Sequence, residues 1–288
     1  MKASRVPTAV LLGTTQLGDS QVSAKPKLYN TAKQKLLDGK QIFSFTQMTP
    51  DVQSYRESAK HYDYAWIEMQ HSTLNFSEVG KMLAACPNSA AIPFIRVPDA
   101  QEWHIQHATD VGALGIIVPT VDDAERAREA AKWVRYPPIG RRSTGRGLYS
   151  TLWDADGNYH QTVNDNMLLV VMIETPTGVA NAFDIASVPG VDVVIIGNND
   201  LTQFSGFAAT DPRYQQMVTK IHDDTLKAGK IFGQANFSFA TGHPLSGSSF
   251  FFQNGPSNDG WKPPAAAGPR GTASPHRRDT ASKRTGRA

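Results

Sequence analysis

The sequence predicts an α/β protein built as a (β/α)8 TIM barrel. First, short apolar runs rich in valine and isoleucine alternate with longer amphipathic stretches along most of the chain, as in repeated βα units. Second, runs such as residues 168–173 (LLVVMI) are continuous enough for strands buried on both faces of a parallel sheet. Third, no glycine-rich GxGxxG turn follows any run, which argues against an open dinucleotide-binding sheet.

Eight apolar runs give the expected strands. Each is short and is bounded by glycine, proline or polar residues, as strands usually are. Closure of the barrel depends on the eighth run, because the segment 238–248 before it is too short and too broken by glycine and proline for a full helix. The expected strands cover residues 41–45, 64–68, 91–97, 115–119, 168–173, 191–196, 231–235 and 250–253.

Helices are expected between these strands. Capping residues mark where they begin, and glycines mark where several of them end. The helix after the second strand has an apolar stripe formed by Phe76, Val79, Met82 and Leu83. The others are a helix capped by Asn30 that ends before Gly39, one over 51–61, one capped by Asp99 that stops at Gly112, one over 122–134, one from Thr175 to about Ser187, and one from Asp211 to Gly229.

One long connection departs from this regular pattern. Residues 148–166 contain Trp153, Asp154, Asp156 and Tyr159 and are predicted to form a polar loop between the fourth helix and the fifth strand. Loops of this length are more often functional or part of an interface than idle.

The composition limits the class of protein. A chain of 288 residues with 40% hydrophobic residues can bury one large core. The single cysteine, Cys86, excludes an internal disulfide framework and a cysteine-rich zinc site. The net charge of the whole chain is +3, but residues 269–288 alone carry six basic residues and one aspartate, so the remainder is about −2. The barrel is therefore not a basic, nucleic-acid-binding body.

The two ends of the chain differ from its centre. Residues 1–29 have a basic start, a short apolar stretch and a small-residue exit, so they are either a disordered leader or a weak secretory signal. Residues 30–259 form the expected barrel domain, and residues 260–288 are expected to be a basic disordered tail without interleaved aromatic residues. No run approaches the roughly 20 apolar residues that span a bilayer. A cytoplasmic protein is expected, with export as the alternative.

Polar side chains follow several strands at the edge where the active sites of barrels lie. Glu174 ends the fifth strand and Asp200 follows the sixth. Two converging carboxylates suit Mg²⁺ or Mn²⁺ and leave positions open for water and substrate. The alternative is that each acid caps a helix.

A second group of polar residues follows the second and third strands. His71 lies after the second strand, where an imidazole beside a metal could move protons, although a lone histidine is usually a surface residue. Arg96 ends an apolar run and needs an anion or a buried acid as partner. Asp110 could be that partner, or it could orient His71.

Several longer motifs occur in a fixed order over residues 40–236. They are DYAWIEMQH (63–71), RVP (96–98), DVGALGIIVP (110–119), RYPPIGRR (135–142), IET (173–175) and PGVDVVIIGNNDLT (189–202). With these motifs the chain resembles the HpcH/HpaI family of metal-dependent (class II) 2-keto acid aldolases, within a superfamily that includes macrophomate synthase and, more distantly, citrate lyase β-type enzymes.

The resemblance implies a barrel of the phosphoenolpyruvate/pyruvate-binding type. Glu174 and Asp200 would bind Mg²⁺ or Mn²⁺, with Co²⁺ as a further candidate, and the cation would chelate the carboxylate and keto oxygen of a pyruvate-like 2-oxo acid. Arg96 would stabilise the enolate oxygen during cleavage or formation of a C–C bond to an aldehyde. A cation and a guanidinium at that oxygen lower the barrier electrostatically, so no Schiff-base lysine is required.

The resemblance also implies roles for the surrounding residues. His71, supported by Asp110, would move protons, and Met172, Gly197 and Asn199 would contact the substrate together with Arg96. The family also suggests a homo-oligomer with sites near the subunit contacts.

Four positions depart from the family's usual residues. Met172 stands where the family has a glutamine, on the same face of the strand as Glu174. Glu68 and Gln70 replace the usual aspartate and acid before the histidine, and Asn198 replaces a proline. Two alternatives to an aldolase therefore stay open. One is a decarboxylating or macrophomate-synthase-like enzyme that uses the same enolate, and the other is a non-catalytic barrel that binds a carboxylic acid.

Overall fold

The strands of the protein form a closed parallel barrel, as predicted. The computed structural model describes residues 28–153, 157–236 and 245–262. Each strand pairs in parallel with the next along the chain, and β8 returns to pair with β1. The strands are β1 (Ile42–Gln47), β2 (Tyr64–Glu68), β3 (Ile92–Arg96), β4 (Gly115–Val118), β5 (Leu168–Ile173), β6 (Val193–Ile196), β7 (Ile231–Gln234) and β8 (Phe251–Phe252).

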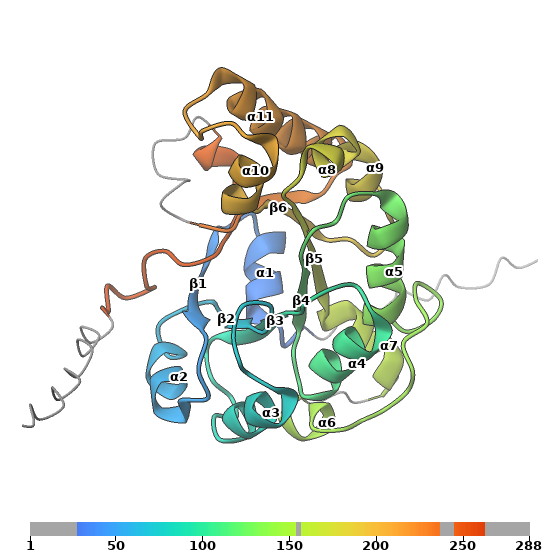
Figure 1. Cartoon of the computed structure of the whole chain (residues 1–288). Coiled ribbons are helices and arrows are strands. Elements are labelled where there is room, and N and C mark those ends of the chain that lie inside the picture. The colour runs from blue at the N-terminus through green and yellow to red at the C-terminus, as the bar shows by residue number, and fades with distance from the viewer. Residues whose placement is uncertain (1–27, 154–156, 237–244, 263–288) are drawn as a thin grey trace, which may run out of the picture.

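Helices surround the strands (Figure 1). Most begin at side-chain caps, such as Asn30 on α1 and Asp211 on α11, where the sequence predicted a helix start, and Asn75 on α3. The helices are α1 (Thr31–Leu37), α2 (Val52–Ser58), α3 (Phe76–Ala84), α4 (Glu102–Asp110), α5 (Ala124–Val134), α6 (Tyr149–Leu152), α7 (Tyr159–Asn166), α8 (Pro176–Ala180), α9 (Ala182–Ala186), α10 (Asn198–Ser205) and α11 (Pro212–Lys227), followed by a 3₁₀ turn, η1 (Ser246–Ser248).

The polar loop predicted over residues 148–166 is wrong in part, because the segment contains α6 and α7. Asn158 caps α7 by accepting a hydrogen bond from the backbone N–H of Gln161. The helix buries Tyr159 and Val163 while its other positions are polar. This narrow apolar face produced too weak a helical pattern to be recognised in the sequence.

Three further boundaries differ from the sequence prediction. Asp99 does not cap α4, since it pairs with His104 and accepts from the N–H of Gln101, which is the N-cap residue. The helix expected from Thr175 to Ser187 is divided at Asn181, whose side chain donates to the carbonyl of Asp122. Helix α10 was not expected, and it begins directly after β6.

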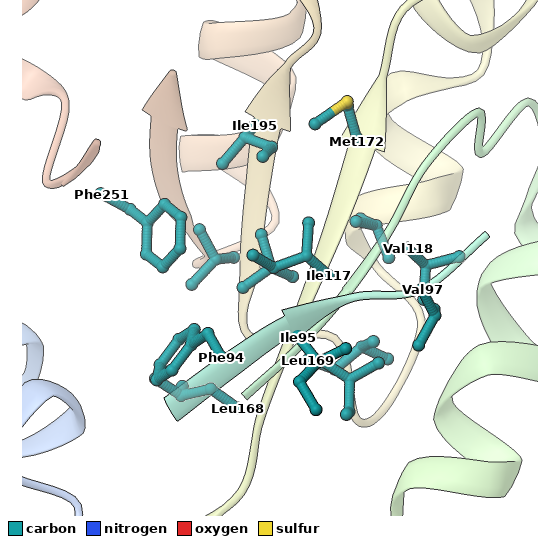
Figure 2. Packing of buried hydrophobic residues seen from close by; sticks show 14 of the residues in the cluster. Phe94, Ile95, Val97, Ile117, Val118, Leu168, Leu169, Met172, Ile195 and Phe251 are labelled. Carbon is teal, nitrogen blue, oxygen red and sulfur yellow. The ribbon is translucent and has the colours of Figure 1, made fainter. Parts of the chain in front are cut away.

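Aromatic and aliphatic side chains fill the interior of the barrel. Phe94 on β3 lies 4.8 Å from Tyr64 and 5.9 Å from Phe251, measured between ring centroids. Gly115 on β4 leaves room for the Phe94 ring, because a Cβ at residue 115 would overlap it. Figure 2 shows Phe94 and Phe251 among the side chains of this core, with Met172 in the same cluster. The interior is therefore a packed core, and a ligand can enter only at an end of the barrel.

Helix α1 closes the end of the barrel where the strands begin. The Asn30 side chain donates to the carbonyl of Asn166, just before β5, and Lys33 donates to the carbonyl of Met167. Ala32 and Leu36 are buried against the core. With this end covered, the C-terminal ends of the strands remain as the face for a site.

The chain that follows β8 packs along the outside of the barrel. Trp261 stacks on His61 at 4.5 Å between ring centroids, and Asn258 donates to Asp63 at the start of β2. Of the predicted leader (1–29) and basic tail (260–288), only residues 28–29 and 260–262 are described, and Trp261 within the latter packs on the barrel. Among the helices that the structure describes, none is long and apolar enough to cross a membrane.

The packing around Phe94 gives a direct test of the core. Replacing Phe94 with Ala should lower the free energy of unfolding by about 3–5 kcal/mol, because the fully buried ring leaves a cavity that the barrel cannot collapse. The measurement is urea unfolding followed by circular dichroism. Leu37→Ala, at a side chain that is 63% exposed, is the control and should change stability by less than about 0.5 kcal/mol. Equal losses in the two variants would contradict this description of the core.

Candidate metal and substrate site

A cavity of about 270 Å³ opens at the C-terminal ends of the strands. It brings together seven of the eight residues that the sequence singled out, from β2, β3, β5 and β6. Residues from the ends of β7 and β8 complete its wall. The lining residues are His71, Arg96, Met172, Glu174, Gly197, Asn198, Asn199, Asp200, Ala235, Asn236, Gln253 and Asn254.

A larger groove of about 830 Å³ lies elsewhere, between the start of α4 and α5. It contains none of the predicted site residues and is lined by acids such as Glu102 and Glu125 and by Trp103 and Trp133. Size alone therefore does not identify the chemical site, and we place that site in the smaller cavity.

Glu174 is held in a fixed position at the end of β5. Its Oε1 accepts a 2.7 Å hydrogen bond from the backbone N–H of Thr120 and a 2.9 Å bond from the Thr120 hydroxyl. On the other side Gly197 lies directly against the carboxylate, so that a Cβ at residue 197 would overlap Oε2 and lie 2.9 Å from the sulfur of Met172. The glycine is needed here for close approach, not for a special backbone conformation.

The electrostatic environment of Glu174 includes Asp200, in the first turn of α10. Burial raises the pKa of Glu174 to about 7; the Thr120 hydroxyl opposes this shift and the neighbouring Asp200 carboxylate adds to it. Within the described chain neither acid takes part in an ion pair. Two adjacent carboxylates without a compensating cation are the ligand set that a hard divalent ion fits.

The protein supplies few further ligands at this point. Among the described residues, no group of three or more His, Cys, Asp or Glu side chains is placed to hold a metal ion. A cation between Glu174 and Asp200 would therefore keep most of its coordination positions for water and a substrate. This is the arrangement expected for a catalytic metal and not for a structural one.

Arg96 is fixed by Glu68, its neighbour in the register of β2 and β3. The Arg96 Nε donates to Glu68 Oε2 at 2.6 Å, and Nη2 lies 2.5 Å from the same oxygen. Burial alone would raise the pKa of Glu68, but the hydrogen bonds and charge of Arg96, with a further bond from Trp66, hold that pKa below its usual value. Glu68 is therefore an anion, as the sequence argument for a buried acid beside Arg96 required.

Glu68 also shapes the turn that carries His71. Its Oε1 accepts hydrogen bonds from the backbone N–H groups of Gln70 and His71, at 2.8 and 3.0 Å. The side chain of His71 is exposed at the rim of the cavity. One carboxylate thus positions both the guanidinium and the histidine loop.

Asp110 is the one predicted site residue that the structure does not bring to this cavity. Helix α4 runs antiparallel to the strands, so its last residue lies near the end of the barrel where β4 begins. There Asp110 pairs with Arg142 at 2.8 Å and accepts from Gln106. The idea that Asp110 is the partner of Arg96 is wrong, because Glu68 takes that place. Its support of His71 stays a prediction without a contact in the described chain.

The comparison with known proteins shows the family to which the chain belongs. The family model described as HpcH/HpaI aldolase/citrate lyase matches residues 52–243. This chain belongs to that family. The HpcH/HpaI match includes every predicted site residue, from His71 to Asp200.

Two curated relatives and one solved structure extend the comparison. The chain is 37% identical over 175 residues to a hydroxypyruvate/pyruvate aldolase of Delftia acidovorans, covering 60% of this chain and 65% of that protein. It is 32% identical to a 2-keto-3-deoxy-L-rhamnonate aldolase of Klebsiella pneumoniae, over 72% of this chain and 79% of the relative. The crystal structure of an HpcH/HpaI aldolase from Desulfitobacterium hafniense matches 77% of this chain and 89% of its own with a TM-score of 0.69 and 26% identity.

Sequence reasoning missed several residues of this HpcH/HpaI site. Thr120, which holds Glu174, has a positive φ of 51°, an uncommon conformation for a threonine. Its only signal was its place just after β4. Asn236, Gln253 and Asn254, which follow β7 and β8, were also missed, because these polar residues have no charge to mark them.

The raised pKa of Glu174 predicts how the metal-free protein responds to pH. A carboxyl with a folded pKa of about 7 and an unfolded value of 4.5 binds more protons when folded. The free energy of unfolding should therefore fall as pH rises from about 5 to 7.5, by on the order of 1–3 kcal/mol. Stabilisation by added Mg²⁺ should grow over the same range, because protons compete with the ion.

The comparison that isolates Glu174 is wild type against Glu174→Gln, followed by thermal unfolding in EDTA and in Mg²⁺ at several pH values. The difference in stability between wild type and Glu174→Gln should change with pH as described above for the free energy of unfolding. An equal pH response of wild type and variant would refute the assignment of this pKa to Glu174.

Gly197 predicts a second, local effect. A Cβ in Gly197→Ala would push against the Glu174 carboxylate and separate it from α10, so Mn²⁺ affinity should fall by about 10-fold or more. Isothermal titration with Mn²⁺ measures this change. Gly247→Ala is the matched control, since a Cβ there would meet open space. Unchanged Mn²⁺ binding in Gly197→Ala would contradict the proposed contact.

Proposed function

We propose that this protein is a divalent-metal-dependent carbon–carbon lyase, a class II aldolase that cleaves or forms a C–C bond at a pyruvate-like 2-oxo acid. The observation that carries the proposal is the uncompensated pair of Glu174 and Asp200 in one cavity with Arg96. The family and its aldolase relatives support the same reaction class. The alignment spans 65% of the Delftia relative. The aldolase activity in that relative's name is therefore part of our proposal for this chain.

Glu174 and Asp200 would hold the divalent ion, which we infer to be Mg²⁺ or Mn²⁺ with Co²⁺ as a further candidate. When bound, such an ion supplies a Lewis acid that stabilises negative charge on the oxygens of the 2-oxo acid. The protein's own contribution is to fix the acids. Thr120 and Gly197 hold Glu174 from two sides, so the carboxylate needs little rearrangement when a ligand enters.

Arg96 would stabilise the enolate oxygen that develops when the C–C bond breaks. Glu68 binds the Nε and Nη2 atoms of Arg96, which leaves Nη1 as the donor available to a substrate. The contact of Nη1 in the described chain is the sulfur of Met172, 4.0 Å away in the wall of the cavity. A thioether is a weak acceptor and competes little with an oxygen of the substrate. A positioned donor of this kind is worth about 100- to 1,000-fold in rate.

His71 would move the proton between the aldehyde-derived hydroxyl and solvent. Its exposed position at the cavity rim gives it access to both water and the opening. In the cleavage direction the hydroxyl loses its proton, the C–C bond breaks to give an aldehyde, and the electron pair becomes the enolate of the 2-oxo acid. Gly197 and Asn199, at the start of α10, would contact the same substrate. An aldehyde is the second substrate, while a homo-oligomeric state and a cytoplasmic location remain predictions.

The metal ligands provide the decisive test of this function. Glu174→Gln and Asp200→Asn should each lower metal-dependent pyruvate release from a 4-hydroxy-2-oxo acid by more than about 100-fold, because even outer residues around metal sites cost about 10- to 100-fold. Both variants should also lose Mn²⁺ binding in a titration. Glu125→Ala, at an exposed acid on α5, is the control and should retain both properties.

Two outcomes would exclude the proposal. Turnover that persists in wild type after exhaustive treatment with EDTA would exclude the metal-dependent mechanism. Binding of a 2-oxo acid without release of an aldehyde, from a panel of 4-hydroxy-2-oxo acids, would indicate the non-catalytic barrel instead. Analysis of the products from oxaloacetate separates an aldolase from an enzyme that only decarboxylates.

A further inference from the structure

Asn198 lines the cavity at the first position of α10, next to Gly197 and two residues before Asp200. Its side-chain Oδ1 accepts a hydrogen bond of 3.2 Å from the hydroxyl of Tyr214 on α11. Tyr214 is completely buried, so its ring cannot swing away to release the amide. The amide of Asn198 is thus held in one orientation by a contact between two helices.

The other end of this amide has no partner. In the part of the chain that the structure describes, the Nδ2 atom of Asn198 is buried and makes no hydrogen bond. With Oδ1 accepting from the Tyr214 hydroxyl, Nδ2 is the atom of this amide that is left without a partner. A buried amide N–H without an acceptor is rare in folded proteins, and at a ligand cavity it indicates an acceptor that arrives with the ligand.

The neighbouring groups indicate which ligand atom that acceptor is. The Nδ2 donor shares its helix end with the backbone N–H groups of residues 198 and 199, which have no acceptor within α10, and this end carries the positive part of the helix dipole. An anionic oxygen is favoured there over a neutral keto oxygen. Arg96 enters the cavity from β3 and is the donor available to the keto oxygen.

We propose that Asn198 is a substrate-binding residue whose Nδ2 donates a hydrogen bond to the carboxylate of the 2-oxo acid, with Tyr214 as the residue that positions it. This inference rests on the proposed function, because it takes a 2-oxo acid as the ligand of the cavity. Asn198 occupies the position where the HpcH/HpaI family usually has a proline, whose side chain has no donor. The contact would therefore be an addition particular to this chain.

Asn198→Pro and Asn198→Ala both remove the donor. Proline is compatible with the first turn of a helix and so keeps α10 intact. In the presence of saturating Mn²⁺, both variants should raise the Kd for pyruvate by about 10- to 100-fold, the effect of losing a hydrogen bond to a charged group. They should leave the affinity for Mn²⁺ within about threefold, because neither variant removes a proposed metal ligand. Tyr214→Phe keeps the ring but frees the amide, and should weaken pyruvate binding by a smaller factor.

A comparison of two 2-oxo acids shows which end of the ligand Asn198 contacts. A contact with the carboxylate predicts the same fold-change in Kd for pyruvate and for hydroxypyruvate, because these acids differ only at C3. A loss confined to hydroxypyruvate would overturn the assignment, since it would place the contact at the C3 oxygen. Unchanged pyruvate binding in a folded Asn198→Ala that still binds Mn²⁺ would also overturn it, without affecting the proposed lyase activity. Failure of wild type to bind any 2-oxo acid would overturn both proposals.

Discussion

The proximity of two carboxylates, Glu174 and Asp200, is the constraint on which the rest of this site depends. Folding places like charges together at a position where burial and repulsion raise the pKa of Glu174 to about 7. This proximity is energetically unfavourable, and the positive φ of Thr120 adds backbone strain. Thr120 is the residue that holds Glu174 with two hydrogen bonds. A strained residue at this place is consistent with a site whose geometry is fixed before the ligand arrives.

Barrel geometry explains which residues can join this pair. Strand ends converge on one face, so Arg96 from β3 and Glu174 from β5 enter the same cavity although 78 positions separate them in the sequence. The helices return in the opposite direction, which takes Asp110 at the end of α4 to the other end of the barrel. The buried carboxylate of Glu68 orients both the guanidinium of Arg96 and the loop of His71. Glu68 and Arg96 meet because they are neighbours in the register of β2 and β3, although 28 positions separate them in the sequence.

Most of the barrel could be predicted because each strand is a short continuous apolar run, and β2 and β5 were predicted to the residue. The strand-end rule then identified the acids and Arg96. Contacts between elements could not be predicted in this way. Thr120 binds Glu174 across 54 positions, and Tyr214 reaches Asn198 from a different helix. Helix α7 was missed because Tyr159 and Val163 give it only a narrow buried face among polar residues.

The departures from the usual family residues change the donors and acceptors around the acids without disturbing the acids themselves. Met172 replaces an amide by a thioether, which leaves the Nη1 face of Arg96 without a strong protein acceptor. Asn198 replaces a ring without a donor by an amide whose Nδ2 is unpartnered among the described residues. Both changes leave a protein donor without a strong acceptor in the described chain, so that an oxygen of the ligand can accept from it. The substitutions are therefore better explained by altered recognition of the 2-oxo acid than by loss of the site, because decay of a site would not be expected to preserve the buried, hydrogen-bonded Glu174 beside Gly197.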